Sequence, residues 1–465
     1  MVTEKLLSAT EERAGPYGER MQALGADIEA IGEVELFGRV AALQGLLVEI
    51  AGPVRQMRVG SRLKIADSDA HSVHCEVVGF RGERALALPL DPLEGVRMGC
   101  RAVIEAGEPV IRPSKGWLGR VIDGRGMPID GKGPLVPGAG SYDLRAKPPA
   151  AHTRQRVGAP IDLGVRALNT FTTCCQGQRM GIFAGSGVGK SVLFSMIARN
   201  TDADVAVIGL IGERGREVQE FLQDDLGEEG LKRACVVVAT SDEPALMRRQ
   251  AALMAMTLAE YFRDQGKNVL LMMDSLTRFA MAQREIGLAS GEPPTAKGYT
   301  PTVFTELPRL LERAGPGPKG SGMITGLFTV LVDGDDHNEP VSDAVRSIVD
   351  GHIVMERSIA ERGRYPAVNI LKSVSRTMPE SSAAEFRPVI KQARNLLATY
   401  ADMEELIRLG AYRKGSDPLV DEAIALNAPL EAFLSQAKDE ATTIEEGYRT
   451  LAAIVDGGRS QRADE

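Results

Sequence analysis

The chain has 465 residues, which at about 150 residues per domain indicates two to four domains and a core that needs no disulfide or structural metal. Its 55 Lys and Arg against 63 Asp and Glu give a net charge of −8, which excludes an extended basic surface for DNA or RNA. Hydrophobic residues make up 43% and charged residues 25%, as in folded soluble proteins, so a disordered or fibrous chain is also excluded.

The sequence also bears on the cellular compartment. Residues 1–13 carry acids and hydroxyls where a signal peptide needs a basic start and an apolar stretch. The strongest apolar runs, 205–211 and 269–273, are far shorter than the ~20 residues that cross a bilayer as a helix. Five cysteines, an odd number, favour a reducing compartment. We expect a cytoplasmic protein, with a peripheral role at a membrane left open.

The first segment, residues 1–31, is polar except for four apolar residues spaced by three and four: Met21, Leu24, Ile28 and Ile31. This spacing predicts a helix with one apolar face, which needs a partner. Either the following domain or another protein fits that requirement, and we interpret the segment as a partner-docking helix.

The second segment, residues 32–102, consists of short apolar runs at 45–50, 62–66, 74–78 and 84–90, separated by turn residues. Such spacing predicts a small β-barrel. Only Phe37 and Phe80 are available there for stacking on bases, so we interpret the domain as an oligomerisation collar and not as a nucleic-acid module.

The third segment, residues 103–380, begins with a glycine-rich stretch at 116–133 that we interpret as a connector. Beyond it, predicted strands at 179–183, 205–211, 234–239, 269–273 and 327–332 alternate with helical patterns such as 244–265. This alternation predicts a mostly parallel sheet covered by helices. After Pro379 the patterns at 386–406 and 419–454 are helical, so residues 381–465 form a predicted C-terminal helical domain.

The most informative motif is GIFAGSGVGKSVL at residues 181–193. It lies between a predicted strand and a predicted helix, the context in which a glycine-rich loop binds phosphates through its backbone N–H groups. The usual first glycine is replaced by Ala184, another small residue. The candidate nucleotide-binding residues are Gly185, Ser186, Gly187, Val188, Gly189, Lys190, Ser191 and Val192. A chance glycine loop is the alternative.

Two acids follow other predicted strands of the same sheet. Asp274 ends the run VLLMMD and is a second candidate for holding Mg²⁺ through water, beside the Ser191 hydroxyl. Glu213 follows the strand at 205–211, at the sheet edge where ligands bind, and is the candidate carboxylate for activating water. A solvated loop acid is the alternative for Glu213.

The combination of AGSGVGKS, GERGRE, LLMMDSLTRFA and PAVNILKSVS resembles the catalytic subunits of rotary ATP synthases and their relatives. Within that family, GEPPTAKGYTPTVFTELPRLLERAG, VDGDDHNEPVSDAVRSIVDGHIV and ERGRYPAVNILKSVSR are most similar to the ATPases of type III protein export, with the flagellar branch the closer match. The resemblance is strong over residues 121–376 and rests on weaker motifs elsewhere. It implies a small β-barrel, a central P-loop (RecA-like) α/β domain and a C-terminal helical domain.

The resemblance also implies roles for single residues. Lys190 and Ser191 hold the phosphates of ATP and Mg²⁺, Glu213 activates water with Arg214 beside it, and Asp274 organises the magnesium shell. Lys190, Glu213 and Arg214 are therefore candidate catalytic residues.

Two further positions come from the resemblance alone. Tyr365 matches the residue whose ring lies against the adenine, and Arg376 matches the arginine that reaches into the neighbouring subunit's site. Because one chain carries both Glu213 and a candidate arginine finger, we expect a homohexamer with sites completed between subunits.

The resemblance predicts an ATPase of the flagellar type III export apparatus at the cytoplasmic face of the inner membrane. Its expected partners are a stator-like regulatory protein at the N-terminus, a central stalk protein and chaperone–substrate complexes near residues 410–425, and membrane proteins of the export gate. The alternatives are a virulence injectisome ATPase, a rotary synthase catalytic subunit, and a hexameric RNA translocase, which the charge balance and the few aromatics do not favour. A zinc site at His71, His74 and Cys75 lacks a fourth ligand nearby, so Mg²⁺ and ATP are the only cofactors expected.

Overall fold

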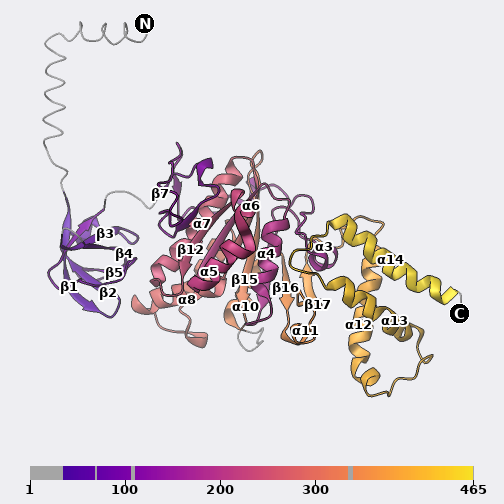
Figure 1. Ribbon diagram of the computed structural model, residues 1–465. Helices are drawn as coiled ribbons and strands as arrows, with labels where there is room; N and C mark the ends of the chain where they lie inside the picture. Colours follow the sequence, from indigo (N-terminus) through magenta and orange to yellow (C-terminus); the bar gives the residue numbers. More distant parts are fainter. Residues whose placement is uncertain (1–34, 69–70, 106–109, 333–338, 464–465) are drawn as a thin grey trace, which may run out of the picture.

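The computed structural model describes residues 35–68, 71–105, 110–332 and 339–463. Figure 1 shows three parts in a row, with a small barrel, a central sheet covered by helices, and a C-terminal group of helices. The predicted fold class is confirmed. The predicted docking helix at 1–31 lies outside the described residues.

The N-terminal part is a closed barrel with strand order β1-β2-β5-β4-β3-β6. Fully buried side chains such as Ile50, Leu63 and Ile65 fill its interior. The sequence predicted four of the strands but not β1 or β6, because their apolar residues are partly exposed. The strands are β1 Phe37–Gln44, β2 Leu47–Ala51, β3 Arg62–Ser68, β4 His71–Arg81, β5 Arg84–Pro89 and β6 Arg101–Ile104, with a 3₁₀ turn η1 at Val54–Gln56.

The central part is a nine-stranded sheet with the order β17-β16-β10-β15-β13-β11-β12-β8 and β14 beside β15. From β16 to β8 the strands are parallel, so their carboxyl ends meet at one edge, whereas β17 runs antiparallel to β16. The strands are β8 Val121–Asp123, β10 Arg179–Ala184, β11 Val205–Glu213, β12 Ala234–Thr240, β13 Asn268–Asp274, β14 Gly315–Pro316, β15 Met323–Leu331, β16 Gly351–Met355 and β17 Val368–Ser375.

The glycine-rich stretch at 116–133 is more than the connector that the sequence predicted. It contributes β8, which pairs with β12 and extends the sheet. A strand of three residues between glycines is too short to show an apolar pattern. Nearby lie the 3₁₀ turn η2 Lys115–Trp117, the strand pair β7 Val110–Ile111 and β9 Tyr142–Asp143, and η3 Ala151–Thr153.

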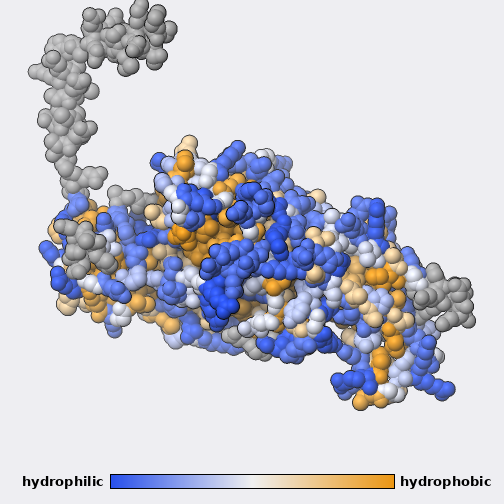
Figure 2. All heavy atoms as spheres, viewed as in Figure 1, coloured by the Kyte–Doolittle hydropathy of each residue, from blue (hydrophilic) through white to orange (hydrophobic). Residues whose placement is uncertain are grey.

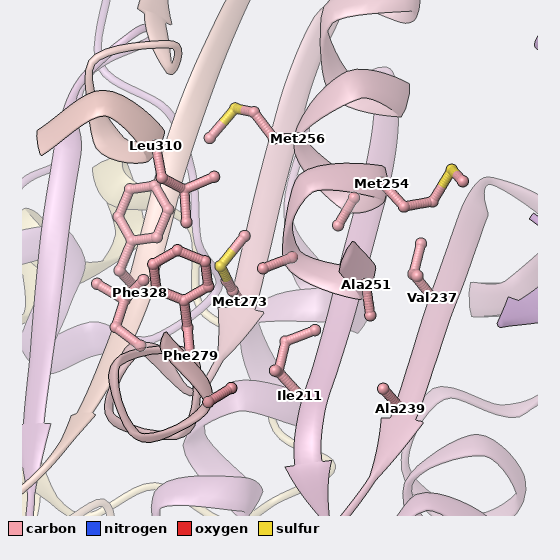
Figure 3. Packing of buried hydrophobic residues seen from close by; sticks show 14 of the residues in the cluster. Ile211, Val237, Ala239, Ala251, Met254, Met256, Met273, Phe279, Leu310 and Phe328 are labelled. Atoms are coloured by element: carbon pink, nitrogen blue, oxygen red, sulfur yellow. The ribbon is translucent and has the colours of Figure 1, made fainter. Parts of the chain in front are cut away.

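The sheet is buried on both faces. Along β10 and β11, Phe183 and Val207 belong to one core layer, and their neighbours Ile182 and Ile208 belong to the layer on the other face of the sheet. Figure 3 shows Met254, Met256 and Met273 filling the first of these layers together with aromatic rings, so the methionines serve as core residues. The first face carries α7 Ala245–Asp264, α8 Leu276–Ala289, α9 Pro301–Leu311 and α10 Pro340–Ile348.

The second face carries the helices that follow β10 and β11 and those near the C-terminus. The predicted helical pattern at 419–454 is interrupted, because residues 435–443 form a non-helical segment held by Arg166, whose Nη2 and Nε donate to the carbonyls of Ser435 and Phe433. The helices are α3 Arg166–Phe171, α4 Lys190–Asn200, α5 Gly215–Glu220, the π-helical η4 Phe221–Leu226, α6 Gly227–Lys232, α11 Arg357–Glu361, α12 Arg387–Arg408, α13 Pro418–Leu434 and α14 Ile444–Ala463.

None of the helices in the described ranges is long and apolar enough to cross a membrane. In β4, Cys75 is buried in the barrel, and His74 Nδ1 lies 2.9 Å from Asp91 Oδ2. Among the described residues, no group of three or more His, Cys, Asp or Glu side chains is arranged to hold a metal ion.

Candidate active site

The glycine-rich loop connects β10 to α4, as the motif predicted. Gly187 and Gly189 have φ values of 77° and 85°, a left-handed conformation that favours glycine. The tip of the loop at Ser186 and Gly187 is exposed, while Val188 is fully buried and anchors it. The first turn of α4 presents Ser191 and Val192, both exposed, beside Lys190. The loop therefore presents backbone N–H groups and a helix N-terminus to solvent, an arrangement suited to a phosphate chain.

Three charged side chains from three different elements meet below this loop. Lys190 Nζ forms a close ion pair with Asp274 Oδ1 and lies 3.6 Å from Glu213 Oε1. Burial alone would lower the pKa of Lys190, but the two carboxylates outweigh it and hold this pKa above its ordinary value. Lys190 is thus a fixed positive charge at the base of the loop.

Asp274 ends β13 and is almost fully buried. Besides Lys190, its Oδ1 accepts a hydrogen bond of 2.7 Å from Thr329 Oγ1 on β15. Thr329 was missed by the sequence reasoning, although a hydroxyl inside the apolar run of residues 323–331 was a visible signal. Threonine and lysine together fix the orientation of the Asp274 carboxylate.

Glu213 ends β11, and its Oε1 is buried without a hydrogen-bond partner. Burial, together with the nearby charge of Asp274, raises the pKa of Glu213 to about 7, although Lys190 acts in the opposite direction. The carboxyl lines a cavity of about 90 Å³ that Ser191 and Asp274 also line. A carboxylate oxygen that accepts no hydrogen bond from the protein, next to a cavity and a phosphate loop, fits an acceptor for water.

Arg214 is adjacent to Glu213 but makes different contacts. Its side chain is 80% exposed, and Nη1 lies 3.3 Å from Glu217 Oε1. The structure therefore brings Lys190, Glu213 and Asp274 together and leaves the Arg214 guanidinium at the surface.

Tyr365 lies against the glycine-rich loop. A Cβ atom built on Gly189 would be 3.2 Å from Tyr365 Cδ1, so the ring borders the loop, and it is half-exposed. The Tyr365 carbonyl accepts from the N–H of Gln436, and Arg357 Nη2 donates to the Ser186 carbonyl at 3.0 Å. Arg357 and Gln436 had no recognisable signal in the sequence, because only the fold brings them to the loop.

Arg376 lies at the opposite edge of the sheet. It follows β17, and its N–H donates to the Asp350 carbonyl, level with Arg179 at the start of β10. Five residues of β10 separate that level from Ala184, which corresponds to about 16 Å along the strand. The exposed Arg376 side chain is therefore remote from the glycine-rich loop of its own subunit.

Comparison with known proteins places this geometry in a family. The profile of the ATP synthase alpha/beta family, nucleotide-binding domain, matches residues 164–375, and that of the T3SS EscN ATPase C-terminal domain matches residues 383–453. The flagellum-specific ATP synthase of Caulobacter vibrioides is 59% identical over 94% of this chain and 99% of that protein. The type 3 secretion system ATPase of Xanthomonas euvesicatoria is 44% identical over 90% of this chain and 94% of that protein.

A solved structure agrees with the fold. The assembled ATPase EscN from the type III secretion system of enteropathogenic E. coli has a TM-score of 0.85 and 43% identity, over 90% of this chain and all of that chain. The chain belongs to the family of flagellum-specific and type III secretion ATPases, a branch of the ATP synthase alpha/beta family.

Proposed function

We propose that this ATPase hydrolyses Mg-ATP between the glycine-rich loop, Glu213 and Asp274, and so supports delivery or unfolding of flagellar export substrates at the membrane gate. The observation that carries the proposal is the buried Oε1 of Glu213, which accepts no hydrogen bond and lies 3.6 Å from Lys190 Nζ, next to Asp274. A structural acid would have its oxygens satisfied, whereas a catalytic one needs a free acceptor.

The donor set fits magnesium bound together with ATP. The exposed Ser191 hydroxyl and the Asp274 carboxylate would hold the ion, Asp274 through water. When bound, Mg²⁺ neutralises charge on the β- and γ-phosphate oxygens. Gly185–Val192 backbone groups and Lys190 would bind the phosphates, and the Tyr365 ring would pack on the adenine.

In this scheme Glu213 orients the attacking water and accepts its proton. Its pKa of about 7 is near the operating pH, where a general base is most effective. Arg214, whose guanidinium is at the surface here, would act only if the loop at 212–216 changes on nucleotide binding.

Arg376 would complete the site of the neighbouring subunit. Its position at the edge opposite to its own glycine-rich loop supports a contact in trans in a head-to-tail ring. EscN is known as an assembled ATPase, and we propose a homohexamer for this chain.

The turn between α12 and α13 is the proposed contact with a central stalk. Exposed leucines gather there, with Leu409 at 69% exposure beside Leu406 and Leu419, and Figure 2 shows hydrophobic residues at the tip of the C-terminal helices. EscN has been solved with its central stalk EscO, in a structure with a TM-score of 0.82 to this chain. Export chaperones with their substrates, a stator-like protein at residues 1–31, and gate proteins at the cytoplasmic face of the inner membrane are the other proposed partners.

The flagellar assignment is supported by flagellum-specific relatives at up to 59% identity, while the Xanthomonas relative keeps an injectisome ATPase as the second candidate. The decisive experiment is a strain whose chromosomal copy carries Glu213→Gln. We expect hook and filament proteins to disappear from the medium while the protein still binds ATP, because the phosphate contacts remain. Glu228→Gln, a change of an exposed acid on α6, is the matched control and should leave secretion intact. If injectisome effectors disappear from the medium while filaments stay normal, the second candidate, an injectisome ATPase, is the correct assignment.

A further inference from the structure

A second cavity, of about 780 Å³, lies between the end of β17, the turn at 378–379 and the start of α12. Its walls are apolar, with Phe171, Val374, Met378 and Ile390 among them. Its charged lining consists of Arg387, Lys391 and Arg394, and no acidic residue lines it. We call this cavity with its three cations the cationic pocket.

The positive charge of this pocket is not balanced within the subunit. Arg387 and Arg394 donate to backbone carbonyls, Arg387 Nε to Ser382 at 3.0 Å and Arg394 Nη2 to Ile370 at 2.9 Å. Lys391 is exposed and forms no ion pair with any residue in the described part of the chain. Because three positive charges surround an apolar cavity, a segment with acidic and apolar side chains is complementary to it.

The position of the pocket indicates where that occupant comes from. Ser375 and Met378 line it, and these two residues flank Arg376 on either side in the sequence. If Arg376 reaches the neighbour's site, as proposed above, the pocket beside it faces the surroundings of the neighbour's Glu213.

Those surroundings are acidic. Glu213 leads directly into α5 and η4, which carry the half-buried Glu217 and the exposed Glu220 and Asp224, with the half-buried Leu222 between the last two. Glu217 and Glu220 form surface ion pairs with Arg214 and Arg216. Within residues 215–232 six acids stand against two basic residues, Arg216 and Lys232. We call residues 217–224 the acidic segment. It offers both the charge and an apolar side chain that the cationic pocket requires.

We propose that the cationic pocket of one subunit docks the acidic segment of the next, and that this contact sets the depth at which Arg376 enters the shared site. The inference rests on the proposed ring with sites completed in trans. A head-to-tail ring repeats the contact at every interface, because each copy carries both surfaces.

The test is charge reversal in the full chain. For each variant, two quantities are measured during dilution: the protein concentration at which specific ATPase activity falls by half, and the concentration at which the ring mass falls by half. Lys391→Glu should raise that concentration about tenfold, since close charge pairs across interfaces are strongly coupled. Adding Glu220→Lys or Asp224→Lys to the same chain should recover most of the loss, because the pair is then restored with opposite signs. Arg449→Glu, which reverses an exposed cation of α14, is the control and should change nothing.

Two outcomes would overturn the docking proposal. In the first, Lys391→Glu leaves the half-activity concentration unchanged. In the second, neither Glu220→Lys nor Asp224→Lys restores the activity that Lys391→Glu loses on dilution. Mixing Arg376→Ala with Glu213→Gln separates this from a failure of the ring itself. If the mixture recovers activity while Lys391→Glu has no effect, only the docking contact is rejected. If the mixture stays inactive and wild-type specific activity does not depend on protein concentration, the proposed ring is rejected.

Discussion

Oε1 of Glu213 is buried and accepts no hydrogen bond, with Lys190 Nζ 3.6 Å away, and the pKa of this carboxyl is raised from 4.5 to about 7 by burial and by Asp274. A carboxyl with a raised folded pKa contributes stability that is fully present below its unfolded pKa and is lost as the pH rises through 7. Glutamine cannot lose a proton, so Glu213→Gln should gain in unfolding free energy over the wild type as the pH rises. We expect the gain to grow by about 2 kcal/mol between pH 5.5 and pH 8, measured by urea unfolding without nucleotide. The control Glu228→Gln should show no such growth, and parallel pH profiles for wild type and Glu213→Gln would contradict the assignment.

The same residue makes a kinetic prediction. Because the base must be ionised, kcat/KM for ATP should rise with pH through about 7 in the wild type.

Lys190→Ala should lose ATP binding as well as turnover, whereas Glu213→Gln should bind ATP and turn it over at least 100-fold more slowly. Binding of a fluorescent ATP analogue beside steady-state hydrolysis separates the two. Weak binding by Glu213→Gln would argue that this carboxylate holds the nucleotide rather than the water.

At the scale of elements, a buried ion pair joins α7 to the chain that follows α9. Arg313 is 3% exposed and reaches both oxygens of Glu260, with Nε at 2.9 Å from Oε1 and Nη2 at 2.6 Å from Oε2. Arg313→Met would leave the Glu260 charge buried and unpaired, so we expect a loss of about 3 to 5 kcal/mol in unfolding free energy. Arg309→Met, which removes a 74%-exposed partner of Glu306, should stay within about 0.5 kcal/mol. Equal denaturation midpoints for the two variants would refute the difference.

At the scale of the whole molecule, the sheet places the two proposed halves of the shared site far apart within one subunit. Lys190 and Glu213 lie at the carboxyl edge of the parallel strands, and Arg376 lies at the other edge. We therefore expect Arg376→Ala and Glu213→Gln to be inactive alone and to recover part of the wild-type activity when mixed under conditions of subunit exchange. A mixture lets some interfaces combine an intact Glu213 with an intact Arg376. Steady-state hydrolysis in the mixture, with exchange followed by fluorescence energy transfer, measures this. Complete exchange without activity would place Arg376 outside the shared site.

Sequence reasoning succeeded where the signal is local. The strands β10, β11, β12 and β13 contain buried apolar runs of five or more residues, so they could be predicted from the sequence. The glycine-rich motif likewise predicted its own position between β10 and α4, and its phosphate-binding residues stay a prediction. Glu213 and Asp274 were candidates because parallel strands place their carboxyl ends at one edge, and the structure brings both side chains next to Lys190.

What the sequence could not determine depends on which segments become neighbours. β8 is too short to show a pattern and is a strand only because β12 offers an open edge. Thr329, Arg357 and Gln436 reach the site from distant parts of the chain through hydrogen bonds that form only after the strands are ordered. The raised pKa of Glu213 likewise arises from burial and from a charge contributed by another strand. The sequence alone thus determined the class of fold and the phosphate-loop motif. The tertiary structure decided the raised pKa of Glu213, the contacts that Thr329, Arg357 and Gln436 add, and the distance of Arg376 from the glycine-rich loop, because each of these depends on residues far apart in the chain.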